Sequence, residues 1–363
     1  MKFSKAFLRL TVASCLMVAV AFSANTIGMK SGKPALKSAG PLAFGPDAIL
    51  FVGDSVGAAI VALDSEDRTP ARSAVKIDVK GVNQKIAAML GTAPDQILIN
   101  DMAVNPVSKK VYLSVSRGRG PDAVPMILRV DATGKITELG LDNVKFSSVS
   151  LPDAPAAKEG RANPRLETIT DLAYVDGNVI VAGLSNEEFS SSLRSIPFPF
   201  QQANKGASIE IYHGSHGRFE TNAPVRTFVP YTLLGQPYIL AAYTCTPLVK
   251  IPVSELKPGN KVKGTTIAEL GNHNRPIDMI TYSKGGQDFI LMANSSRGVM
   301  KMPANGLDKY RGITKPIEDK EGVPYETIAD LKGVMQLDKL DDANALMLID
   351  DAGSLELRTV ALP

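Results

Sequence analysis

The chain of 363 residues contains no tryptophan, only two cysteines and only three histidines. Without tryptophan, carbohydrate binding by aromatic stacking has little support. Cys15 lies in the amino-terminal apolar segment, so Cys245 is the single thiol of the remaining chain and cannot form an internal disulfide. The sequence also lacks a Cys-x-x-Cys-His haem attachment, a P-loop and a Gly-x-Ser-x-Gly elbow. Because no internal disulfide can form, the stability of the mature chain must come from an apolar core.

The first two dozen residues have the features of a secretory signal. Lys2, Lys5 and Arg9 precede the uncharged apolar stretch 10–22, and small residues stand near its end at positions 19, 21 and 23. This stretch is too short to span a membrane, which takes roughly 20 apolar residues. We therefore predict that residues 1–24 are removed and that the protein is periplasmic or secreted. No second run of this length occurs, so no membrane span is expected in the mature chain.

The mature chain carries no excess of either charge. Residues 1–24 hold three basic side chains and no acidic one, which leaves 37 basic and 37 acidic side chains in residues 25–363. A balanced chain without a basic run offers no electrostatic basis for binding nucleic acid or an anionic membrane. We expect a monomer whose partner is a protein or a small molecule.

A repeat organises residues 25–363. Six times, an apolar strand is followed by a small polar turn and an alternating strand, starting with 49–63. Another short apolar strand precedes most copies, and a fourth often follows. Four strands repeated at intervals of roughly 45–65 residues are typical of propeller blades. The sequence predicts an all-β fold, a single β-propeller of about six four-stranded blades, with seven as the alternative count and one short helix over 82–90.

The end of the chain predicts how the ring closes. The sixth unit stops at Pro363, after its third strand. An uncompleted blade would leave an exposed sheet edge. We expect an amino-terminal strand, around 33–38, to complete this last blade.

Two segments resemble known repeats. Residues 41–54 resemble the repeat of secreted NHL and SMP-30/gluconolactonase-like propellers, and residues 101–112 resemble that of YVTN propellers. The resemblance implies the architecture but not the function, because this fold carries lyases, lactonases, binding modules and scaffolds.

Three aspartates occupy the same register of the innermost strand. Asp101, Asp171 and Asp278 recur in three blades, with Gln336 corresponding in the last. Converging oxygens would suit Ca²⁺, as the SMP-30-like resemblance implies, and such an ion would polarise a lactone carbonyl. The structural alternative is that each carboxylate accepts hydrogen bonds from the backbone of a neighbouring blade.

A rim of mixed charge is expected on the face that carries the loops entering the innermost strands. We predict ligand contacts there from turn and loop residues: Asp54, Arg117, Glu187, Glu188, Cys245, Arg275, Arg297 and Asp350. A solvated rim without a ligand is the alternative, since loops are usually polar. The segment 185–207 is expected to be a long third-blade loop, because the prolines at 197 and 199 disfavour a ladder.

The histidines and Cys245 offer weaker candidates. His213 and His216 have the spacing of metal ligands, but the repeat places them on a turn between a third and a fourth strand, on the face opposite His273. We therefore favour surface-turn histidines over a metal site shared with Cys245. No obvious base accompanies Cys245, so a small buried residue is favoured over a nucleophile.

Two functions are compatible with these patterns. The first is a non-catalytic exported propeller that binds a partner or small ligand at this face. The alternative is a metal-dependent hydrolase or lactonase of the SMP-30-like kind, for which Glu167, Asn100 and Asn272 are the candidate further ligands. The two differ in whether the carboxylates lie apart or meet around one point.

Overall fold

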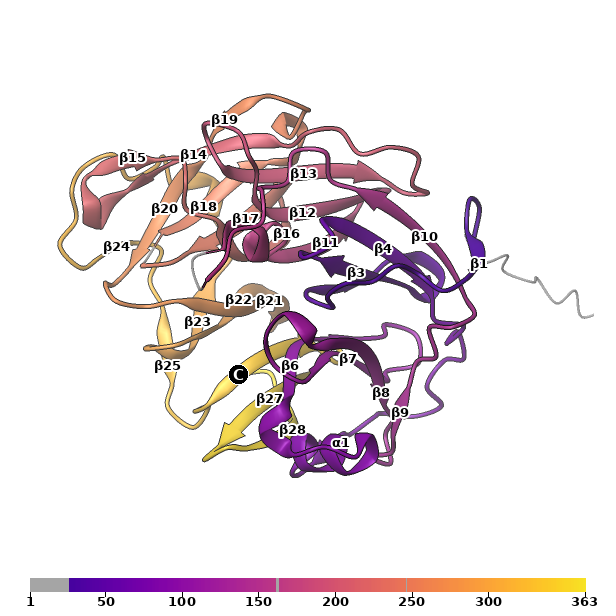
Figure 1. The fold of residues 1–363 in the computed structure, drawn as a ribbon. Coiled ribbons are helices and arrows are strands. Elements are labelled where there is room, and N and C mark those ends of the chain that lie inside the picture. Colours follow the sequence, from indigo (N-terminus) through magenta and orange to yellow (C-terminus); the bar gives the residue numbers. More distant parts are fainter. Residues whose placement is uncertain (1–25, 161–162, 246) are drawn as a thin grey trace, which may run out of the picture.

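The computed structural model describes residues 26–160, 163–245 and 247–363. Six β-sheets stand around one axis (Figure 1), which confirms the predicted single all-β propeller with six blades. The predicted signal sequence, residues 1–24, lies outside the described residues. Among the described residues, no helix has the length and apolar character needed to cross a membrane.

The blades are numbered here by the chain order of their innermost strands, and the strands of each are given from the axis outward. Blade 1 contains β2 (Leu42–Phe44), β3 (Ile49–Asp54), β4 (Ala59–Asp64), β10 (Val144–Ser150) and β1 (Lys30–Gly32). Blade 2 contains β6 (Ile97–Val104), β7 (Val111–Arg117), β8 (Val124–Val130) and β9 (Ile136–Glu138). Blade 3 contains β11 (Asp171–Val175), β12 (Asn178–Leu184), β13 (Ser191–Pro197), β14 (Ala207–His213) and β15 (Arg218–Glu220), with β19 (Lys261–Lys263) also paired to β14. Blade 4 contains β16 (Val225–Leu233), β17 (Gln236–Tyr243), β18 (Pro247–Pro252), β20 (Thr265–Leu270) and β24 (Lys320–Gly322). Blade 5 contains β21 (Pro276–Lys284), β22 (Gln287–Asn294), β23 (Gly298–Pro303) and β25 (Glu326–Ile328). Blade 6 contains β26 (Val334–Lys339), β27 (Asn344–Asp351), β28 (Ser354–Ala361) and β5 (Asp78–Val79).

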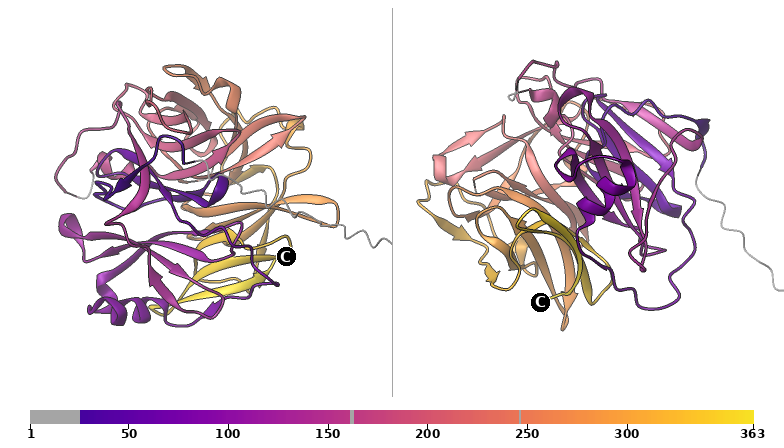
Figure 2. Two further views of the ribbon diagram at one scale, coloured as in Figure 1. Left: turned by 90° about the vertical axis from the view of Figure 1, so that its right-hand side faces the viewer. Right: turned by 60° about the horizontal axis from the view of Figure 1, so that its bottom comes forward.

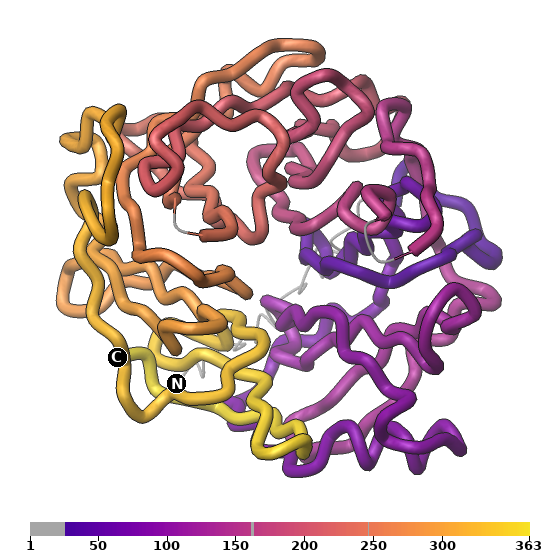
Figure 3. The backbone as a smooth tube through the Cα atoms, turned by 60° about the vertical axis from the view of Figure 1, so that its left-hand side comes forward, coloured from indigo at the N-terminus to yellow at the C-terminus, as the bar shows by residue number. Residues whose placement is uncertain are grey.

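The blades do not follow the chain order around the ring. The innermost strands neighbour one another in the order β6, β2, β11, β16, β21, β26 and back to β6, so blade 1 lies between blades 2 and 3. Figure 3 shows this order by colour, with indigo between purple and magenta. The chain forms β1 to β4 of blade 1, places β5 on blade 6, forms blade 2, and then returns to blade 1 with β10, which pairs with both β4 and β1.

The prediction that residues 33–38 supply the outer strand of blade 6 is wrong. Blade 6 does receive its outer strand from an earlier part of the chain, but that strand is β5, where Val79 pairs with Leu357. The segment expected to do this instead ends beside blade 1, because the backbone N–H groups of Lys37 and Ser38 donate to the buried carboxylate of Asp54 at 2.8 Å. These bonds fix that segment between β1 and β2 of blade 1.

The expected loop over 185–207 contains a strand. Residues 191–197 form β13, which pairs with β12 along its length and supplies the third strand of blade 3. Pro197 is tolerated because it is the last residue of the strand. The rest of the apolar run packs inward: the rings of Phe198 and Phe200 contact Phe51 of blade 1, with centroids 4.9 and 5.9 Å apart.

The core lies between adjacent sheets, because successive strand residues face opposite sides and each side meets a neighbouring blade. Second strands such as β12 are therefore buried almost throughout. The predicted helix is present as α1 (Val82–Leu90). It lies at the periphery of the ring (Figure 2), where Val82 and Ile86 join the apolar cluster between blades 2 and 6.

Candidate functional site

A channel runs along the axis between the innermost strands, formed by three cavities, the middle of which shares lining residues with each of the other two. On the top face, defined as the face with the loops that enter these strands, its mouth is a cavity of about 390 Å³ lined by Asn100, Glu167, Arg226 and Arg275. Below the mouth, the space narrows to about 60 Å³ beside Asp101, Asp171 and Asp278. A wider cavity of about 580 Å³ opens toward the other face.

A repeated backbone irregularity shapes the top mouth. The innermost strands of blades 2, 4, 5 and 6 each shift register once near their start, at Asn100, Arg226, Ile277 and Met335. A β-bulge of this kind re-aims the side chain of the extra residue. Asn100 and Arg226 accordingly line the mouth.

Two guanidinium groups and one carboxylate dominate the mouth. Arg226 Nη1 lies 2.5 Å from Glu167 Oε1, and its Nε donates to Thr244 Oγ1 at 2.8 Å. Partial burial and the charge of Arg226 lower the pKa of Arg275. Among the described residues, no hydrogen bond or ion pair fixes the exposed guanidinium of Arg275. Glu167 therefore neutralises one of the two arginines, and the positive charge of the other remains unbalanced at the mouth.

Below the mouth, four aspartates join neighbouring blades. Each accepts a hydrogen bond from the backbone of the next innermost strand at 2.7–2.9 Å: Asp101 from Leu42, Asp171 from Phe228, Asp278 from Leu337, and Asp338 from Val104. Asp338 was not singled out from the sequence. Gln336, which occupies the register proposed for the last blade, instead donates its amide to the Asn100 carbonyl at 3.2 Å.

These carboxyl groups are difficult to ionise. Burial raises the pKa of Asp171 to about 7 and that of Asp338 to about 6. Burial, together with the nearby charges of the other aspartates, raises the pKa of Asp101 and of Asp278 well above the ordinary value. Near neutral pH, part of this set of carboxyl groups therefore stays protonated, because the ionisation of one disfavours the ionisation of its neighbours.

The aspartates are arranged as hydrogen-bonded and separate groups. Asp171 and Asp278 each also accept a bond from the N–H of the following residue, at 2.7 and 2.8 Å. Within the described residues, Asp101, Asp171 and Asp278 do not form a group whose ligand atoms all lie within 4.8 Å of one another. This geometry agrees with the alternative that each carboxylate accepts hydrogen bonds from the backbone of a neighbouring blade. Calcium binding at these residues stays a prediction.

Of the predicted rim residues, Arg275 lines the mouth. Asp54 is fully buried, and its carboxylate accepts bonds from the backbone of Lys37, Ser38 and Gly57. Arg297 is held by the Asn272 carbonyl at 2.8 Å. Cys245 is partly exposed, and its backbone N–H donates to the Asn274 carbonyl.

The other rim residues do not line the mouth cavity. Glu187 lies 3.3 Å from Lys205, just before β14, and Glu188 lies 3.9 Å from Lys261 of β19. Asp350 closes its own turn by accepting from Gly353 N–H. Arg117 is exposed at the end of β7. The rim residues are thus spread over several blades, while one of them reaches the channel.

Sequence reasoning missed Arg226 and its pairing with Glu167. A signal for Arg226 was present, because it precedes Thr227 as Asn100 precedes Asp101 at the same bulged position. Glu167 was considered only as a metal ligand. Its ion pair with an arginine of the next blade depends on how the two blades meet.

Comparisons with known proteins give structural neighbours only. No family model and no curated protein matches the sequence. Similar solved structures include an oxidoreductase described as a glucose dehydrogenase from Thermus thermophilus (12% identity, 92% of this chain and 100% of that chain, TM-score 0.38). Others are a gluconolactonase from Xanthomonas campestris (11%, 92% and 89%, 0.33) and a PQQ-bound aldose sugar dehydrogenase from Streptomyces coelicolor (11%, 91% and 97%, 0.31).

The names of these neighbours describe the activities of those proteins. At this identity and TM-score, they assign no activity to this chain. The fold itself is established by the six blades around one axis, and the resemblance to secreted NHL, YVTN and SMP-30-like propellers is confirmed at that level.

Proposed function

We propose that this chain is an exported ligand-binding propeller that takes a small hydroxylated anion at the top mouth of its channel. The observation that carries the proposal is the pair Arg226 and Arg275 at one cavity, with Glu167 neutralising one of the two charges. An anion placed there would relieve the unfavourable proximity of the two guanidinium groups. Arginine also matches the planar geometry of a carboxylate.

The size and the walls of the mouth favour a small polar molecule. A volume of about 390 Å³ is within the range of small-molecule sites. The walls are fixed before binding: the Asn100 amide donates to the Ala39 carbonyl at 2.8 Å and to Ser116 Oγ at 2.9 Å. Deeper in the channel, Asp101 and Asp171 can exchange hydrogen bonds with hydroxyl groups, while their burial disfavours a further negative charge beside them. The ligand's anionic group is thus expected near Arg275 and its hydroxyl groups toward the aspartates.

Calorimetric titration with D-gluconate, D-glucose and inorganic phosphate tests this proposal. Gluconate and glucose share hydroxyl groups but differ in the carboxylate, so gluconate should bind at least tenfold more tightly. Arg275→Ala should weaken gluconate binding by about 10- to 100-fold, the usual contribution of a charge-assisted hydrogen bond. Arg117→Ala removes an exposed arginine outside the cavity and should leave binding unchanged. Absence of gluconate binding, or equal affinity in Arg275→Ala, would contradict the proposal.

A divalent-cation-dependent hydrolase or lactonase is the second candidate. The observation in its favour is the mutual repulsion of Asp101, Asp171 and Asp278, which a bound cation would relieve. This candidate requires the three carboxylates to move closer together than they lie here. It predicts that 1 mM CaCl₂ raises the melting temperature relative to chelator and that Asp278→Asn abolishes this rise. An unchanged melting temperature removes its physical basis.

A further inference from the structure

A β-hairpin at the outer part of blade 3 brings two histidines and a glutamate together. It consists of β14, a 3₁₀ turn (Gly214–His216) and β15. In the antiparallel pairing, Ile211 lies opposite Glu220 and His213 opposite Arg218, so His213 and Glu220 share one face. The turn then returns His216 toward the same carboxylate.

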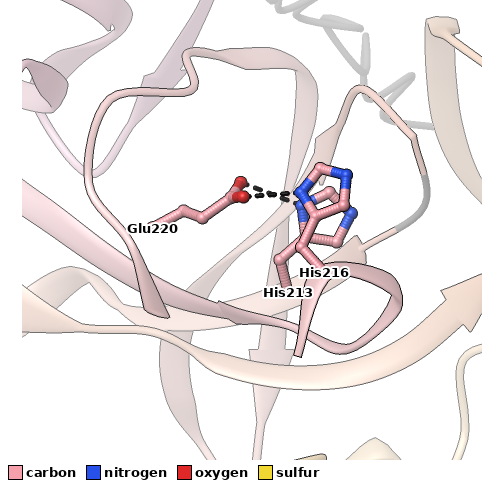
Figure 4. Close-up of side chains that lie close together, drawn as sticks. All are labelled: His213, His216 and Glu220. Carbon is pink, nitrogen blue, oxygen red and sulfur yellow. Dashed lines mark hydrogen bonds and ion pairs between the residues drawn. The ribbon is translucent and has the colours of Figure 1, made fainter. Parts of the chain in front are cut away.

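The side chains converge at short range (Figure 4). His213 Nδ1 lies 2.9 Å from Glu220 Oε2, and His216 Nδ1 lies 2.6 Å from Glu220 Oε1. The centroids of the two imidazole rings are 3.9 Å apart. One ligand atom from each of the three residues lies within 4.8 Å of the other two.

This donor set matches a borderline transition ion. Zinc is bound by histidine nitrogen and carboxylate oxygen at about 2.0–2.2 Å, which places neighbouring ligand atoms about 3 Å apart in a tetrahedral or octahedral shell. The observed nitrogen–oxygen separations are close to that spacing and need to open by only a few tenths of an ångström. Two imidazoles also disfavour Ca²⁺ and Mg²⁺, which prefer oxygen ligands.

The surroundings allow an ion to enter. His213 is 2% exposed and is held in place, whereas the side chain of His216 is 44% exposed. Burial opposes ionisation of Glu220, but the hydrogen bonds with His213 and His216 prevail and hold its pKa below the ordinary value. The carboxylate is therefore ionised at neutral pH. Arg218 Nε, 3.3 Å from Glu220 Oε1, is a competing cation with 70% of its side chain exposed, so it can turn away into solvent.

We propose that His213, His216 and Glu220 form a binding site for one divalent transition ion of the Zn²⁺ class. The bound ion would link β14, the turn and β15 of the hairpin. Three protein ligands leave at least one coordination position for water or a further ligand. The sequence pattern favoured two surface-turn histidines; the tertiary structure instead buries His213 and adds Glu220. The site is separate from the residues of the channel mouth and does not depend on the proposed ligand.

Titration of tag-free mature protein with Co²⁺, followed by displacement with Zn²⁺, tests the proposal. Bound Co²⁺ should give a d–d absorption band that saturates at one equivalent and disappears when Zn²⁺ is added. His216→Ala removes the exposed ligand and is the variant least harmful to folding. Glu220→Gln keeps the shape of the side chain but removes its charge. Each should weaken binding by at least tenfold, while His273→Ala, which removes the remaining histidine, should leave affinity unchanged.

The pH dependence adds a second readout. Because only neutral imidazole binds a metal, affinity should fall as the pH is lowered from 7.5 to 5.5. The proposal is overturned if the wild type binds less than one equivalent at micromolar concentrations. It is also overturned if His216→Ala and Glu220→Gln bind as tightly as the wild type, or if His273→Ala abolishes binding.

Discussion

The carboxyl group of Asp171 should make the folded protein less stable as the pH rises. Its pKa is raised from the ordinary 3.8 to about 7 by burial in the channel. Between these two values, the folded state binds a proton that the unfolded state has released. Stability from this group is therefore complete below about pH 4 and is lost as the pH rises toward and through 7.

The raised pKa sets the size of the effect. The difference between 3.8 and about 7 corresponds to an upper limit of about 4 kcal/mol in the free energy of unfolding. About 3 kcal/mol of this is lost between pH 5 and pH 8, where the unfolded-state carboxyl is already ionised. Asp338, with a pKa of about 6, changes in the same direction.

Urea unfolding at pH 5, 6, 7 and 8 in the presence of chelator measures this loss. Asp171→Asn cannot ionise but accepts only one of the two backbone N–H groups, from Leu172 and Phe228, that the carboxylate accepts. The variant should be about 1–2 kcal/mol less stable than the wild type at pH 5. This deficit should shrink or reverse at pH 8, because the variant has no charge to bury. Contributions from the histidines cancel in the comparison.

Asp131→Asn is the matched control. This aspartate caps an exposed turn, and hydrogen bonding to Thr133 keeps its pKa below the ordinary value despite the opposing effect of burial. Its substitution should lower stability by a similar amount at every pH from 5 to 8. The reasoning is refuted if wild-type stability rises over this range while the difference from Asp171→Asn stays constant.

Three further predictions concern the closure and the core. Val79→Asp places a charge between blades 2 and 6, so it should lower the free energy of unfolding by at least about 3 kcal/mol. It should also speed hydrogen exchange along β28, the strand that contains Leu357. Slow exchange in that strand would contradict closure by β5. Asp153→Ala leaves the fully buried guanidinium of Arg194 without its ion pair and should cost about 3–5 kcal/mol in urea unfolding, and a cost below 1 kcal/mol would show that the pair is dispensable. Phe51→Ala, which empties the aromatic cluster between blades 1 and 3, should cost about 3–5 kcal/mol, and a melting temperature within 2 °C of wild type would refute this packing.

Local pattern was enough to predict the repeating units. Alternation and turn residues predicted the paired strands of five blades, since neighbouring strands joined by short turns pair locally, but β13 of blade 3 was expected to be a loop. The helix at 82–90 followed from the same kind of local periodicity. The recurrence of Asp101, Asp171 and Asp278 at one register also predicted that they would lie on innermost strands, and they do.

Contacts between distant segments could not be predicted in this way. Arg226 and Glu167 are far apart in the sequence and meet because blades 3 and 4 adjoin. The grouping of His213 with Glu220 depends on the register of the β14–β15 hairpin. The sequence pattern places the turn of this hairpin after the third strand of its blade, whereas β14 is the fourth strand. In both cases, the residue types were visible but their partners were not.

By itself, the sequence determined that this chain forms about six β units with an apolar core and without an internal disulfide, because the alternation of apolar and polar residues encodes which face of each strand is buried. Only the tertiary structure decided that blade 1 lies between blades 2 and 3 and that β5 completes blade 6. The physical reason is that strand edges pair through backbone groups that nearly every residue carries. The partner of an outer strand is therefore selected by the packing of the whole ring, which no local pattern records.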